Sequence, residues 1–166
     1  MFYTRNGLEK LCSSSMILCD GTFKTAPSMF YQLYSIHGVV NEFTFPLVYC
    51  LASRKDENFY SRMLNQLKSH ASEMSLDLNP EYISSDFELP FMNAVRSVFP
   101  NSAVHGCLFH YSQSIWRNAV NKGLKVPFSS FPAVRSTIQC LLALPFVPLL
   151  RFEFLCVVQR LHSSVA

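Results

Sequence analysis

The stretch SMILCDG, residues 15–21, is a short apolar run that ends in an aspartate and a glycine. About four to eight apolar residues closed by a turn signal are typical of a buried strand. We therefore expect a strand over Ser15–Cys19 and a turn at Asp20-Gly21. Asp20 does not fit an apolar interior, because an unpaired carboxylate there is costly and must find water, hydrogen bonds or a cation.

Two runs rich in aromatic and β-branched residues follow this strand, FYQLYSIH at 30–37 and FTFPLVYCL at 43–51. Such runs are typical of strands, and Gly38 with Asn41-Glu42 supplies a turn between them. Three strands in meander order are therefore expected. Pro46 has no N–H to donate to a ladder, so it predicts an edge position or a bulge in the third strand.

The apolar period lengthens after Asp56, where apolar residues recur at helical spacing from Phe59 to Met74. The later elements are expected in this order: a strand at 82–85 leading into Asp86, a helix at 89–98, a strand at 103–109, a helix at 112–122 and Pro-punctuated helices beyond 127. Three antiparallel strands followed by alternating helices and strands predict a mixed α/β sheet with helices on its faces. This succession resembles the ribonuclease-H-like fold, although other α/β folds share it.

The chain of 166 residues is 49% hydrophobic and 15% charged, a balance that predicts one folded domain rather than a disordered chain. Its 14 Lys and Arg residues against 11 acidic residues give a net charge of +3. The basic residues are scattered, so charge by itself does not indicate nucleic-acid binding. The sequence contains no glycine-rich phosphate-binding loop, which disfavours kinases and dinucleotide-binding proteins.

Most of the six cysteines lie inside apolar runs, and residues 1–11 carry charges and no apolar signal segment. This pattern predicts reduced thiols in a nuclear or cytoplasmic protein that is not secreted. The apolar run at 138–158 is interrupted near its centre by two prolines and two charged residues. Because a central charge costs roughly 3 kcal/mol in a membrane, the run predicts short helices, and no membrane partner is expected.

Asp20 and Asp86 each follow a predicted strand. If those strands are neighbours, the carboxylates face each other and repel unless one is protonated or a divalent cation lies between them. Two carboxylates that bridge Mg²⁺ are typical of two-metal phosphoryl transfer. In a simpler interpretation Asp20 begins a turn and Asp86 caps the next helix. Glu88 is interpreted as a first-turn helix carboxylate rather than a group supporting a metal site.

Cys107 and His110 form a second constellation, because a cysteine and a histidine at this spacing can ligate one metal where a strand turns into a helix. A structural zinc normally needs about four protein ligands, and Cys140, Cys156 and His162 follow no recognisable zinc spacing. A packed cysteine and a hydrogen-bonded histidine are the simpler interpretation. A cysteine nucleophile with a histidine base is the least favoured, since no orienting third group is marked.

Several sequence blocks occur in a fixed order along the chain: DGTFKTAP at 20–27, FYQLYSIHG at 30–38, PLVY at 46–49, DFE at 86–88, VFP at 98–100, and GCLFH at 106–110 running into Gln113 and Trp116-Arg117. Together these blocks resemble those of Mutator-like element (MULE) transposase domains, over roughly residues 2–148. The order of several independent blocks makes the resemblance more specific than any single motif.

This resemblance implies a DDE transposase, a ribonuclease-H-like domain in which three acids hold two divalent metal ions. On this basis Asp20 and Asp86 are catalytic residues and ligands of Mg²⁺ or Mn²⁺. Cys107 and His110 correspond to the family's Cys-x-x-His motif, which either binds a metal such as zinc or shapes the site. The implied activity is DNA cleavage and strand transfer in transposition, so the implied partner is transposon-end DNA. The oligomeric state is not implied.

The third acid of the family is a glutamate that lies beyond a helical insertion. We expect residues 1–126 to form an incomplete transposase core and residues 127–166 to begin that insertion. Glu153 is the only acid after Glu88, and its position between Phe152 and Phe154 makes it a poor third ligand. These observations predict a truncated copy without the third acid.

Three hypotheses about function follow. The first is a MULE-type transposase domain for metal-dependent DNA strand cleavage and transfer, expected to be inactive as this polypeptide. The alternative is a non-catalytic, host-retained remnant that binds DNA or protein. A third hypothesis is a zinc-stabilised interaction module built around Cys107 and His110.

Overall fold

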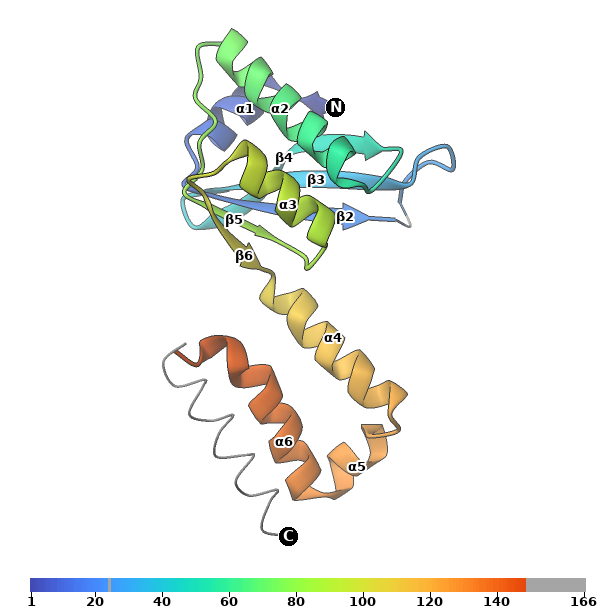
Figure 1. The fold of residues 1–166 in the computed structure, drawn as a ribbon. Coiled ribbons are helices and arrows are strands. Elements are labelled where there is room, and N and C mark those ends of the chain that lie inside the picture. The colour runs from blue at the N-terminus through green and yellow to red at the C-terminus, as the bar shows by residue number, and fades with distance from the viewer. Residues whose placement is uncertain (24, 149–166) are drawn as a thin grey trace. The chain divides into compact units, whose positions relative to one another are not determined.

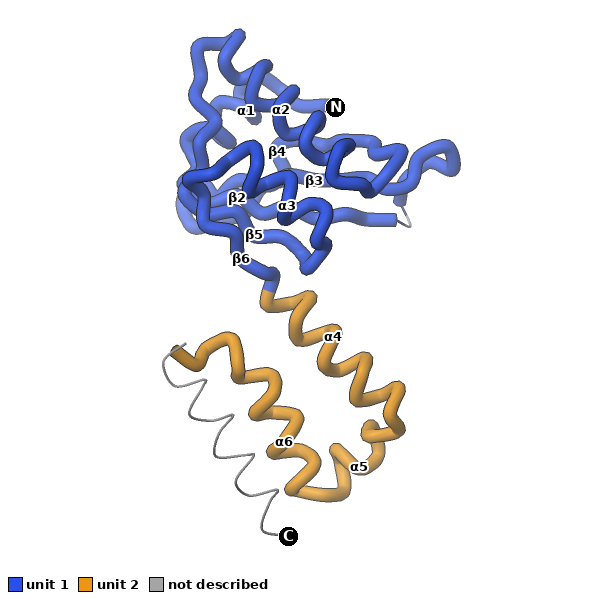
Figure 2. The backbone as a smooth tube through the Cα atoms, viewed as in Figure 1, with its two compact units in different colours: residues 1–107 blue, residues 108–166 orange. Residues whose placement is uncertain are grey.

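The computed structural model describes residues 1–23 and 25–148 of the chain. The chain divides into two compact units, residues 1–107 and residues 108–166 (Figure 2). All strands of the described residues lie in the first unit. The expected division into a core of residues 1–126 and an insertion from residue 127 stays a prediction.

The first unit is built around a six-stranded sheet of order β1-β4-β3-β2-β5-β6 (Figure 1). The pairs β1–β4, β4–β3 and β3–β2 are antiparallel, whereas the pairs β2–β5 and β5–β6 are parallel. The elements of this unit are β1 (Phe2–Tyr3), α1 (Arg5–Cys12), β2 (Met16–Thr22), β3 (Gln32–Val40), β4 (Phe43–Ala52), α2 (Glu57–Glu73), β5 (Tyr82–Ser85), α3 (Leu89–Val98) and β6 (Ala103–Gly106). The predicted mixed α/β class is confirmed, and the finer ribonuclease-H-like assignment stays a prediction.

The core lies between one face of this sheet and the helices α1, α2 and α3 (Figure 1). Leu8 of α1, Ile36 of β3 and Phe91 of α3 are all fully buried there. Along β3 the side chains alternate, with Tyr34 and Ile36 buried and the intervening residues half-buried, as the period-2 geometry of a strand requires. One face of the sheet is therefore packed, and the other carries the more accessible side chains.

Two predicted boundaries are wrong. Asp20 and Gly21 belong to β2 rather than to a turn, because their pairing with Ser35 and Tyr34 of β3 continues past Cys19. Leu108 and Phe109 belong to a helix rather than to a strand, because the β5–β6 ladder ends at Gly106. The elements β1 and α1 were not predicted, since two strand residues and one short charged helix give little periodicity.

The hairpin between β3 and β4 confirms two other predictions. Asn41 and Glu42 both take positive φ angles, 50° and 69°, as a tight two-residue turn between twisted strands requires. The pairing register shifts between Ile36 and His37, whose partners are Val48 and Pro46. Pro46 thus lies at a bulge, where its missing N–H leaves no ladder bond broken.

The second unit is helical over its described residues 108–148, with α4 (Leu108–Asn121), α5 (Lys125–Ser130), α6 (Pro132–Ala143) and a short 3₁₀ turn η1 (Leu144–Phe146). Gly123 follows α4 with φ of 76°, which confirms the predicted stop. Glu153, Cys156 and His162 lie outside the described residues, as does much of the apolar run at 138–158. Among the described helices none is long and apolar enough to cross a membrane. The five cysteines of the described residues carry free thiols.

Candidate metal centre

Strands β2 and β5 lie side by side in a parallel register that pairs Leu18 with Ser84 and Cys19 with Ser85. The next residue along each chain is an aspartate, Asp20 within β2 and Asp86 just past the end of β5. Neighbouring strands are about 4.8 Å apart. The register therefore places Asp20 and Asp86 at adjacent positions near the carboxyl ends of both strands, although they are far apart in sequence.

Both carboxylates influence the buried thiol of Cys19 electrostatically. Burial raises the pKa of Cys19 far above its ordinary value, and the negative charges of Asp86 and then Asp20 act in the same direction. Because Coulomb effects decline with distance, both carboxylates are within electrostatic range of this buried thiol on β2. This observation agrees with the strand register.

Asp20 has polar neighbours on β3. The Ser35 Oγ donates a hydrogen bond to the main-chain oxygen of Asp20 at 3.3 Å, and His37 Nε2 lies 2.9 Å from the same Ser35 Oγ. Burial lowers the pKa of His37, and the Asp20 carboxylate partly opposes this shift. Sequence reasoning missed Ser35 and His37. Their alternate spacing put them on one face of a strand, but only the register of β3 on β2 brought that face to Asp20.

Asp86 and Glu88 lie together in the short connection between β5 and α3. The backbone N–H of Glu88 donates to Asp86 Oδ1 at 3.4 Å. Glu88 is the N-cap residue of α3, yet its carboxylate makes no capping hydrogen bond, and its Oε2 instead accepts from the Tyr60 hydroxyl at 2.9 Å. Burial raises the pKa of Glu88, the hydrogen bond from Tyr60 opposes this, and the Asp86 charge adds to it. Glu88 therefore lies at the N-cap of α3, just before the expected first turn, and its favourable interaction with the helix dipole stays a prediction.

Two glycines allow the sequence blocks to approach one another. A Cβ added at Gly21 would lie 2.6 Å from Gln32 Oε1 and 3.3 Å from the Tyr34 ring, both on β3. A Cβ added at Gly106 would overlap the ring of Phe87. Because Gly21 has no side chain, β2 packs closely against Gln32 and Tyr34 of β3. Because Gly106 has none, the ring of Phe87 packs closely against the backbone of β6.

Cys107 and His110 fall on either side of the division between the units. Cys107 follows β6, and its N–H donates to the Ser85 oxygen at 2.6 Å, which extends the β5–β6 ladder by one bond. His110 lies in the first turn of α4, in the second unit. The predicted zinc at these residues stays a prediction.

The donor set around Asp20 and Asp86 suits a hard cation. Carboxylate oxygens are preferred by Mg²⁺ and Mn²⁺, whereas zinc favours sulfur and imidazole nitrogen. Mg²⁺ commonly takes one or two carboxylates, keeps several waters and binds substrate phosphates. In residues 1–23 and 25–148, no three His, Cys, Asp or Glu side chains are placed to hold an ion together. The described residues thus form no closed cage of protein ligands, and the metal site at Asp20 and Asp86 stays a prediction.

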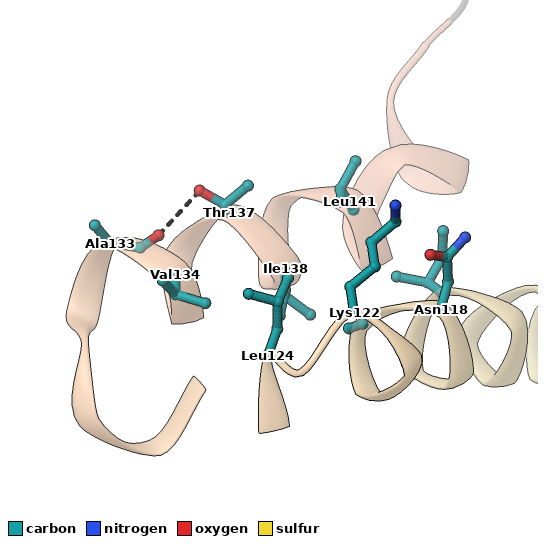
Figure 3. A pocket seen from close by; sticks show the side chains of 10 residues that line it. Asn118, Lys122, Leu124, Ala133, Val134, Thr137, Ile138 and Leu141 are labelled. Carbon is teal, nitrogen blue, oxygen red and sulfur yellow. Dashed lines mark hydrogen bonds between the residues drawn. The ribbon is translucent and has the colours of Figure 1, made fainter. Parts of the chain in front are cut away.

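A groove in the second unit has a different character. It is about 490 Å³ in volume and is lined by α4, by α6 and by Lys122 and Leu124, which follow α4 (Figure 3). Its described lining contains no Asp, Glu, His or Cys side chain. The groove is therefore apolar and offers no ligands for an ion.

The first unit is a mixed α/β domain with two neighbouring aspartates near the carboxyl ends of parallel strands. A family model described as the MULE transposase domain matches residues 16–114, more than half of the chain, and this match spans both aspartates and the Cys-x-x-His motif. The chain belongs to the MULE transposase domain family, as the sequence blocks indicated. A comparison with curated proteins found no match. The family indicates a function related to transposition and, in general terms, to DNA.

Proposed function

We propose that the first unit is the metal-dependent DNA-processing part of a MULE transposase, with Asp20 and Asp86 as the carboxylates that hold the catalytic ion. The adjacency of these two residues in the β2–β5 register is the observation that carries the proposal. Two ionised carboxylates at adjacent strand positions repel each other, and a divalent cation relieves that repulsion. If Asp20 only began a turn and Asp86 only capped a helix, the two residues would have no need to lie at adjacent strand positions.

The chemistry proposed is phosphodiester cleavage followed by strand transfer. Asp20 and Asp86 would hold a Mg²⁺ or Mn²⁺ ion, which would supply charge stabilisation to the attacking and leaving oxygens of the phosphate. The pairing of β2 with β3 and β5 fixes the backbone position of Asp20. Ser35 supports Asp20 from the neighbouring strand through its hydrogen bond to the Asp20 main-chain oxygen.

Features at the same end of the sheet support a nucleic-acid substrate. Phe23 and Tyr31 are about half exposed and form an edge-on ring pair with centroids 5.5 Å apart. The Lys55 ammonium lies 5.5 Å from the Tyr31 ring, and its pKa is raised by contact with Tyr31 and, more weakly, by the charges of Glu88 and Asp86. Exposed aromatic rings beside a cation suit stacked bases and phosphates. We therefore propose that Phe23, Tyr31 and Lys55 form a DNA-binding surface at this end of the sheet.

Isothermal titration of the purified chain with Mn²⁺ tests the metal site. We expect measurable binding that falls by more than about tenfold in Asp20→Asn and in Asp86→Asn, since each change removes a charged ligand. Asp56→Asn is the matched control, because it removes a carboxylate of the same unit that caps α2 and Asn caps a helix equally well. Equal Mn²⁺ affinity in all four proteins would refute the metal site.

DNA chemistry is tested separately with supercoiled plasmid and Mg²⁺ or Mn²⁺. Nicking that depends on the ion and is lost in Asp20→Asn and Asp86→Asn supports the proposed activity. Ion binding and DNA binding without any nicking would instead support a non-catalytic DNA-binding role for this polypeptide.

A further inference from the structure

Phe23, Tyr31 and Lys55 form an aromatic corner at the end of the sheet where β2 stops and β3 begins. Phe23 directly follows β2, Tyr31 directly precedes β3, and Lys55 lies between β4 and α2. The rings of Phe23 and Tyr31 are nearly perpendicular, at 85°, with centroids 5.5 Å apart. The Lys55 Nζ lies 5.5 Å from the centroid of the Tyr31 ring. Tyr31 thus contacts both other members of the corner.

The backbone of the sheet holds both aromatic residues in place. The Tyr31 N–H donates a hydrogen bond to the oxygen of Ala52, the last residue of β4, at 2.8 Å. Phe23 continues directly from β2, whose pairing with β3 extends to Thr22 and Leu33. An aromatic side chain on a fixed backbone loses little conformational entropy when a ligand binds to it. The two rings therefore form a prearranged surface.

Packing does not explain the exposure of these rings. Phe23 is 53% exposed and Tyr31 is 47% exposed. Three other aromatic residues of the first unit, Tyr34, Tyr60 and Phe91, are fully buried and contact one another. A ring that serves the core buries most of its area in this way. The open half of the corner instead suits a flat, partly apolar ligand.

A nucleobase is a ligand of this kind. Bases of any sequence stack on aromatic rings, while Lys or Arg binds the phosphate beside them. In a duplex the faces of the bases are covered by their neighbours, and a protein reaches the base edges in the grooves and the phosphates outside. An exposed ring therefore suits a nucleotide whose base is unpaired.

The charges around the corner also favour stacking over contact with a duplex backbone. Binding to a duplex backbone draws on several cations, each of which neutralises a phosphate. The negative charges of Glu88 and Asp86 act on Lys55 and partly offset its charge. A lysine in this setting suits one phosphate next to a stacked base better than the two strands of a duplex.

We propose that the aromatic corner binds an unpaired nucleotide of single-stranded DNA, whose base stacks on Phe23 and whose phosphate is held by Lys55. Tyr31 contacts both residues and sets the angle at which they face the nucleotide. This inference rests on the proposed function, because it specifies which form of DNA the surface takes.

Fluorescence anisotropy of the full chain without divalent ions tests the inference. The probes are a thymidine oligonucleotide of about 15 nucleotides, a duplex of the same length, and a strand of abasic sites that keeps only the sugars and phosphates. We expect the chain to bind the thymidine strand more tightly than either other probe. Phe23→Leu should weaken that binding by about tenfold, since leucine is apolar but cannot stack, whereas Phe23→Tyr should bind normally.

Lys55→Gln should reduce the salt dependence of binding to the thymidine strand. The slope of log affinity against log salt concentration should become shallower by about 0.7, the contribution of one phosphate contact on a single strand. An unchanged slope would overturn the assignment of Lys55 to a phosphate.

Phe43→Leu is the matched control, because Phe43 is an exposed phenylalanine that pairs with Phe45 beside the β3–β4 turn, at the other end of β3. It should leave binding to every probe unchanged. The inference is overturned if Phe23→Leu weakens binding to duplex and thymidine strand equally, or weakens neither, results that leave the proposed function intact. Equal affinity for the abasic and thymidine strands also overturns it, since phosphates alone would then be recognised. If the unmodified chain binds none of the probes, the proposed DNA function fails together with the inference.

Discussion

Gly21 shows how one residue without a side chain supports the candidate site. A Cβ at this position would come within 2.6 Å of Gln32 Oε1, and Gln32 is fully buried and already committed to Tyr60. Gly21→Ala must therefore displace the Gln32 amide. We expect it to destabilise the protein by about 1–3 kcal/mol, the usual cost of overpacking a core.

Urea unfolding followed by circular dichroism measures this change, with Ser53→Ala at an exposed position after β4 as the control. Wild-type stability in Gly21→Ala would mean that Gln32 can move freely, and it would remove the structural basis for holding Tyr60 in place.

His37 provides a residue-scale prediction about pH. Burial holds the pKa of His37 below its ordinary value of 6.5 in the folded protein. The neutral form is thus favoured by folding, so the stabilising contribution is present above pH 6.5 and is lost as the pH falls through the folded pKa. We expect the melting temperature to fall more between about pH 8 and about pH 5 in the unmodified chain than in His37→Gln. An equal fall in melting temperature over this pH range in both proteins would contradict this expectation.

At the scale of elements, α2 carries Tyr60 to the site and depends on its first turn. The Asp56 carboxylate accepts a hydrogen bond from the Phe59 N–H at 2.8 Å and thereby caps the helix. Asp56→Ala removes this cap and should cost about 1 kcal/mol. Asp56→Asn should cost much less, because its side-chain oxygen accepts the same bond.

Chemical unfolding of both variants at Asp56 distinguishes a cap from a charge effect. If the stabilisation came mainly from the charge near the helix N-terminus, Asn and Ala would destabilise the protein equally.

The elements themselves were predictable to different degrees. Residues 82–85 and 89–98 were predicted with the bounds that the structure has, because a strand and a helix are separated there by an abrupt change of period. The end of β2 was not predictable, since Asp20 and Gly21 are turn formers locally and only pairing with β3 keeps them in the strand. Pairing with a distant strand thus overruled a local turn preference at Asp20.

At the scale of the whole molecule, the two units differ in how much core they contain. Most of the buried apolar side chains belong to residues 1–107, whereas among described residues 108–148 Ala119 and Ile138 are buried. Burial of apolar surface is the main favourable term in folding. We expect a fragment of residues 1–107 to unfold cooperatively, with a melting temperature close to that of the main transition of the full chain.

Differential scanning calorimetry of the fragment and of the full chain checks this expectation. A fragment that melts without a cooperative transition would show that the sheet needs the second unit in order to fold, and the candidate site would then have to be studied only in the full chain.

The sequence by itself determined the α/β class, the family and the two aspartates as candidates, because apolar periodicity and ordered sequence blocks are local features. It did not determine that Asp20 and Asp86 are neighbours, since strand order depends on how the whole sheet assembles. Nor did it indicate the path from Gln32 through Tyr60 to Glu88, whose members come from three separate elements. Hydrogen bonds between distant segments exist only in the folded chain, and for that reason the tertiary structure alone decided which side chains surround the aspartates.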